Sequence, residues 1–156
     1  MDTILLLLGF WIFICTVAQG VGTFTQDWLK NDYGDALGII PYNTADPAWF
    51  IASSYMMLAA FFLMVLVLIH YIVLVHRTSK FGYLAFYRRT LYAMAFETVI
   101  VMGLTVISLI LLSTNLKGFY SVLSLGYSAW ICVGSTCASV GIVILCIFSA
   151  KKFNQY

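Results

Sequence analysis

Long uncharged stretches divide the chain into four apolar segments that are separated by short polar ones. They cover about residues 3–23, 49–75, 90–113 and 120–150, and each is long enough to supply the roughly 20 apolar residues of a membrane-spanning helix. Lipid offers the backbone no hydrogen-bond partner, so a span is helical unless it belongs to a closed barrel. The alternation over about ten residues that marks barrel strands is missing. The pattern predicts an all-α fold: one domain over residues 1–156, a four-helix transmembrane bundle with a short, partly ordered first outer loop.

The composition supports this prediction and excludes several classes of protein. Of the 156 residues, 63% are hydrophobic and 9% are charged, whereas an average soluble domain is about a quarter charged. So few charges exclude a soluble enzyme domain, a disordered chain and a nucleic-acid binder, which needs clustered Lys and Arg. The sequence describes an integral membrane protein surrounded by lipid.

The distribution of Lys and Arg predicts the orientation. The second loop and the C-terminal tail carry six of the eight cations, and the first and third loops carry the other two, Lys30 and Lys117. Because cytoplasmic loops are enriched in Lys and Arg, we expect both termini and the second loop to be cytoplasmic. The first and third loops then face the exterior or a lumen. The membrane is expected to be the plasma membrane.

The first span has two interpretations. Its Leu-rich stretch and the small residues near Ala18 and Gly20 would suit a cleavable signal peptide. A signal peptide has a positively charged start and an apolar core of about 7 to 15 residues. This chain has Asp2 at its start and a longer apolar run, so we favour a retained span.

Glu97 is the only acidic residue inside a predicted span. A carboxylate in the bilayer is costly and generally faces protein or water. Glu97 lies about seven residues, or roughly 10 Å, from the cytoplasmic end of its span, and His70 has a matching depth in the preceding span. We expect this buried polar pair to face each other or to share a water. The pair is either a structural contact that holds the second and third spans together or a site that binds a proton or a ligand. In a third interpretation, a neutral Glu97 bonds to a hydroxyl or a carbonyl, or contacts a partner subunit.

Small residues in the fourth span predict a face where helices approach closely. The residues predicted to pack against a partner helix are Gly126, Trp130, Gly134 and Ala138. Close packing within the bundle is the alternative interpretation of the same residues.

The first outer loop is the one sizeable polar segment, and its 25 or so residues cannot bury a core alone. Trp28, Asp32 and Asp35 are its predicted contacts with the bundle or a partner. The loop also contains the apolar residues Leu37, Ile39 and Ile40. We expect these either to form a short strand or to lie on the bilayer.

The sequence contains none of the common catalytic motifs. A phosphate-binding Gly-rich loop, a zinc-binding H-E-x-x-H motif and a nucleophile elbow are all missing. All four cysteines lie in predicted spans, where apolar packing is the simplest interpretation; they are Cys15, Cys132, Cys137 and Cys146. We expect no catalytic residue, no cofactor and no metal site.

Two local features accompany the predicted topology. Trp28 follows the first span in Thr25-Gln26-Asp27-Trp28, and the fourth span opens with Leu125-Gly126-Tyr127-Ser128-Ala129-Trp130 and continues with small residues. Together with the four spans, the cytoplasmic ends and the larger first outer loop, these two features resemble the claudin superfamily. That group includes claudins, peripheral myelin protein and the calcium-channel gamma and AMPA-receptor regulatory subunits. The resemblance implies a protein that assembles with other membrane proteins.

The chain departs from that superfamily in its first outer loop. The loose signature W-x-x-G-L-W-C-C is absent beyond Trp28, and so is the outer cysteine pair. The loop is also expected to be too short for the extracellular sheet of the family.

The features together favour a non-enzymatic tetraspan protein that acts by association, as a cell-junction component or an auxiliary subunit of a channel or receptor. Its expected partners are membrane lipids and either another integral membrane protein or further copies of itself, with no nucleic acid. The alternative is a small oligomeric membrane enzyme or transport subunit that uses Glu97 and His70.

Overall fold

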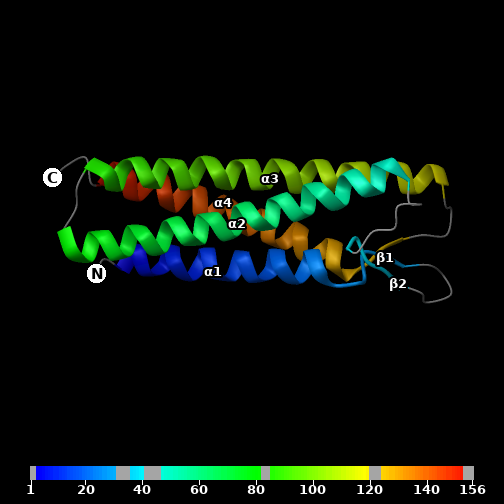
Figure 1. The fold of residues 1–156 in the computed structure, drawn as a ribbon, viewed down its shortest axis with the longest axis horizontal. Coiled ribbons are helices and arrows are strands. Elements are labelled where there is room, and N and C mark those ends of the chain that lie inside the picture. The colour runs from blue at the N-terminus through cyan, green and yellow to red at the C-terminus, as the bar shows by residue number, and fades with distance from the viewer. Residues whose placement is uncertain (1–2, 31–35, 41–46, 82–84, 120–123, 153–156) are drawn as a thin grey trace.

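The computed structural model describes residues 3–30, 36–40, 47–81, 85–119 and 124–152. Four helices in these segments run along the long axis of the molecule (Figure 1): α1 (Thr3–Phe24), α2 (Ala48–Phe81), α3 (Ala85–Phe119) and α4 (Tyr127–Lys152). All four are long and apolar enough to cross a membrane. The predicted four-helix transmembrane bundle is therefore confirmed.

The helices α2 and α3 are longer than the spans predicted for them. They contain 34 and 35 residues, or about 50 Å each, against roughly 40–45 Å for a bilayer with its headgroups. The predicted spans 49–75 and 90–113 end where the charges begin, but both helices continue through the charged residues. A change of polarity marks the edge of the lipid and does not by itself end a helix. The fourth helix begins at Tyr127, later than the predicted start at 120, and residues 120–123 lie outside the described segments.

The helices form a closed ring in which α1 and α3 each pack against both α2 and α4. The start of α1 and the end of α4 lie at one end of the bundle, together with the end of α2 and the start of α3 (Figure 1). We call this end the inner end and the opposite end the outer end.

The interior consists of two apolar clusters, one after the other along the bundle. The inner cluster includes Leu8, Ile12, Met64, Leu91 and Ile142. The outer cluster includes Trp28, Ile39, Phe50, Met57 and Leu112. Every helix contributes side chains to this interior.

Large apolar side chains also cover the outside of the bundle. Phe10, Phe62, Phe96 and Ile144 are each about 60% exposed or more. A contiguous apolar exterior would cause aggregation in water, whereas in a bilayer these side chains contact lipid tails.

A small antiparallel sheet covers the outer end (Figure 1). Strand β1 (Leu29–Lys30) lies between β2 (Ala36–Leu37) and β3 (Ser124–Leu125), with Leu29 opposite both Leu37 and Leu125. The first loop supplies two of these two-residue strands, and the third comes from the segment before α4. The sheet therefore ties the first loop to the start of α4.

Candidate functional site

The structure brings His70 of α2 and Glu97 of α3 together. His70 Nδ1 lies 2.9 Å from Glu97 Oε2, and the two side chains are 36% and 17% exposed. His70 is 11 residues before the end of α2 and Glu97 is 12 residues after the start of α3, so antiparallel packing places them at one depth. The hydrocarbon core of a bilayer offers no hydrogen-bond partner, so within it the contact gives each of these two polar side chains a partner.

The chemistry open to this pair is the sharing or transfer of one proton. Within the described residues, no group of three or more His, Cys, Asp or Glu side chains could hold a metal ion. The direct structural effect of the pair is a polar link between α2 and α3.

A double-mutant cycle measures that link. We expect Glu97→Gln and His70→Ala each to lower the free energy of unfolding by about 1–2 kcal/mol, and the double variant to lose about 1 kcal/mol less than their sum. Unfolding in mixed micelles with increasing SDS provides the measurement. The control cycle combines Glu97→Gln with His76→Ala, since His76 is exposed and lies six positions further along α2; its effects should add. Additive effects in the His70 cycle would show that the pair does not interact.

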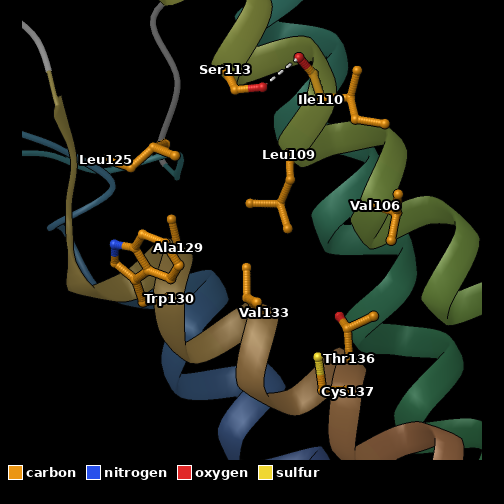
Figure 2. Close-up of a pocket in the computed structure, with 10 residues that line it drawn as sticks. All are labelled: Val106, Leu109, Ile110, Ser113, Leu125, Ala129, Trp130, Val133, Thr136 and Cys137. Atoms are coloured by element: carbon orange, nitrogen blue, oxygen red, sulfur yellow. Dashed lines mark hydrogen bonds between the residues drawn. The ribbon is translucent and has the colours of Figure 1, made fainter.

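An apolar groove of about 320 Å³ lies between α3 and α4 (Figure 2). Its walls include Val106, Leu109 and Ile110 of α3 and Ala129, Trp130 and Val133 of α4. It extends from Leu125 beside the sheet to Cys137, about ten residues or 15 Å along α4. The groove therefore occupies the outer half of the bundle at the depth of the lipid tails.

The polar groups at the groove are already satisfied by their own helices. Ser113 donates to the carbonyl of Ile110 at 3.1 Å, and Thr136 donates to the carbonyl of Cys132 at 2.8 Å. None of the lining residues carries a charge. The groove consequently favours an apolar occupant.

The four residues predicted to pack against a partner helix separate into two kinds. Trp130 is 65% exposed, and a Cβ on Gly134 would meet nothing within 4 Å. Gly126 instead lies against the backbone of Asp27, and the Ala138 carbonyl accepts a 2.7 Å hydrogen bond from Trp11 Nε1. For Gly126 and Ala138, which contact Asp27 and Trp11, the structure favours the alternative interpretation of packing within the bundle.

Of the three predicted outer-loop contacts, the structure describes one, Trp28. Trp28 is fully buried, and its Nε1 donates to the Gly22 carbonyl at 2.7 Å. It fills the outer cluster, so of the two expected kinds of contact, with the bundle or with a partner, Trp28 makes the one with the bundle. Asp32 and Asp35 lie outside the described residues.

Sequence reasoning overlooked Gln19, a buried polar residue in the first span. Its side chain is 1% exposed, and its Nε2 donates to Thr105 Oγ1 of α3 at 3.3 Å. The bond crosses the bundle between helices that are not neighbours in the ring. Gln19 is uncharged, so an inspection of charges passes over it; an amide within an apolar span is the signal that identifies it.

Apart from Trp130, the groove residues named above gave no sequence signal, because an apolar residue in a span has the same appearance in the sequence whether it faces lipid or a neighbouring helix. Cys137 belongs with them: it is exposed at the groove, unlike the three buried cysteines.

Comparisons with known proteins agree with the fold. A family model described as "Tight junction protein, Claudin-like" matches residues 1–155. No curated protein is significantly similar to the chain. The family match extends over all four helices and over the sheet at the outer end. This chain belongs to the claudin-like family of tight junction proteins.

Proposed function

We propose that the protein is a non-enzymatic tetraspan that acts by assembling with another integral membrane protein, as a cell-junction component or an auxiliary subunit of a channel or receptor. Membership of a claudin-like family supports a role in assembly. The excess of Lys and Arg at the inner end supports a plasma-membrane orientation with both termini cytoplasmic. The α3–α4 groove is the observation that carries the proposal.

The groove has the features that favour helix association in lipid. Lipid tails are as apolar as leucine, so association there depends on close packing, and small residues at an interface permit it. Cys137 is a small residue that is exposed at the groove, and the exposed Trp130 ring lines it two turns away on the same helix. An apolar side chain of a partner helix can enter the groove and contact both α3 and α4.

Filling the groove tests the proposal. Cys137→Leu adds bulk at an exposed position that lines the groove, so the stability of the isolated protein should be unchanged within about 0.5 kcal/mol. Binding of a membrane partner should fall at least about tenfold, because the space for its side chain is occupied. After extraction in mild detergent, quantitative mass spectrometry gives the ratio of co-purifying membrane protein to this chain.

Ala59→Leu is the matched control. Ala59 is exposed on α2, and the substitution adds a similar bulk to a surface that does not line the groove. The partner should remain bound to Ala59→Leu and be lost from Cys137→Leu. Equal retention by both variants, or recovery of a lone homo-oligomer with a bound small molecule, would reject the proposal.

The alternative function, a small membrane enzyme or transport subunit, has the His70–Glu97 contact in its favour. Glu97 precedes Val106 of the groove wall by nine positions, or roughly two and a half helical turns. The pair and the groove therefore lie on opposite sides of α3 and do not form one substrate site. This separation makes assembly the better supported function.

A further inference from the structure

The inner end of the bundle carries a concentrated positive charge that the proposed assembly through the groove does not use. Its cations are Arg77 and Lys80 of α2, Arg88 and Arg89 of α3, and Lys151 and Lys152 of α4. All six are exposed. They belong to three helices that end or begin at the same end of the molecule (Figure 1).

Among the described residues, only two carry a carboxylate. Asp27 lies at the outer end, and Glu97 contacts His70 within the bundle. Within the described segments, Arg77, Lys80, Arg89, Lys151 and Lys152 thus have no carboxylate at their own end of the molecule.

Along the bundle, these cations lie at the level of the lipid headgroups. Arg77 follows the predicted span 49–75 by two residues, and Arg89 immediately precedes the span that begins at 90. Helices of about 50 Å exceed the roughly 30 Å hydrocarbon core, so α2 and α3 project through the headgroup layer.

One contact orders this end of the hairpin. The guanidinium of Arg77 lies 4.6 Å from the centre of the Phe86 ring, and thereby joins the last turns of α2 to the first turn of α3. The cations of the two helices are consequently held together before any ligand binds, which reduces the cost of ordering them.

From this arrangement we propose that the inner end binds a polyphosphorylated lipid headgroup, such as that of a phosphoinositide, in the leaflet around it. Phosphate monoesters carry more charge than the single net charge of phosphatidylserine, and arginine forks match phosphate oxygens in pairs. The site is independent of the α3–α4 groove. It takes the inner end as cytoplasmic, the side on which such lipids gather.

Lipid retention measured by native mass spectrometry tests the proposal. Delipidated full-length protein in detergent is titrated with phosphatidylcholine, phosphatidylserine and phosphatidylinositol 4,5-bisphosphate. We expect the bisphosphate lipid to bind at least about tenfold more tightly than phosphatidylcholine, with phosphatidylserine in between, since each cation near a membrane surface contributes about fivefold.

The variant Lys80→Gln/Arg89→Gln/Lys151→Gln/Lys152→Gln should remove that preference. It leaves Arg77 on Phe86 and keeps Arg88, so the hairpin contact remains. A second variant, Lys80→Arg/Arg89→Lys/Lys151→Arg/Lys152→Arg, keeps all charges and should keep the preference; it separates loss of charge from loss of structure. Lys30→Gln at the outer end should have no effect.

Several results would overturn the proposal. One is equal retention of the three lipids by the wild-type protein, and another is an unchanged preference in the glutamine variant. A third is full competition by soluble inositol 1,4,5-trisphosphate at the same concentration as the lipid, which would assign the surface to free polyphosphates. Binding of a poly-glutamate peptide without any lipid preference would assign it to an acidic protein segment.

Discussion

Replacing Trp28 with alanine is expected to lower the free energy of unfolding by about 3–5 kcal/mol. The ring is fully buried in the outer cluster, and its Nε1 donates to the Gly22 carbonyl at 2.7 Å. Removal of the ring leaves a cavity and an unpaired carbonyl at the last turn of α1. Thermal unfolding in detergent, followed by circular dichroism, measures the change.

Two further variants separate the causes of this effect. Trp28→Phe keeps most of the volume and loses the hydrogen bond, so it should cost about 1–2 kcal/mol. Trp130→Ala removes the same side chain from a site that is 65% exposed, and should cost less than about 1 kcal/mol. If Trp28→Ala and Trp130→Ala were equally destabilising, the buried position of Trp28 would be wrong.

The membrane-spanning part of the fold could be predicted because it depends on polarity alone. Fourteen charged residues are few enough that their spacing marks the edges of lipid. The pairing of His70 with Glu97 followed from the same information, since residues at matching distances from the cytoplasmic ends of adjacent antiparallel spans reach equal depth. The end of α2 at Phe81 and the start of α3 at Ala85 lie beyond the lipid, where no change of polarity in the sequence marks them.

The outer end could not be predicted in the same way. Each strand has two residues, too few to show an alternation of apolar and polar positions. The strand pair that closes the sheet joins Leu29 to Leu125, which are far apart in sequence and belong to different loops. A short strand at Leu37 was one of two interpretations, and it is the one found.

The small residues of the fourth span show a second limit. Gly126 and Gly134 look alike in sequence, and both suggest close approach of a helix. Only the packing distinguishes them: Gly126 lies against the chain that follows α1, whereas a Cβ on Gly134 would meet nothing within 4 Å. A pattern of small residues predicts that a surface is suited to close contact, but it does not identify the neighbour.

This difference leads to the second large effect. Gly126→Ala is expected to lower the free energy of unfolding by about 2–3 kcal/mol. A Cβ at this position would overlap the carbonyl of Asp27, and a backbone atom cannot rotate away as a flexible side chain can. The overlap would force apart the hydrogen bonds from Gly126 N to the Trp28 carbonyl at 2.9 Å and from Ser128 N to the Asp27 carbonyl at 3.2 Å.

Gly134→Ala is the matched control, because it makes the same chemical change eight positions further along where a Cβ meets nothing within 4 Å. It should be neutral or slightly stabilising, since alanine favours a helix more than glycine does. Hydrogen exchange adds a local readout: Gly126→Ala should speed amide exchange at β1 and β3 more than in the inner half of α2 and α3. Equal stability of the two variants, or faster exchange spread evenly over the bundle, would mean that the start of α4 is not held against the end of α1. Trp28 would then lose the backbone contact that encloses it, and its large predicted contribution would fall with it.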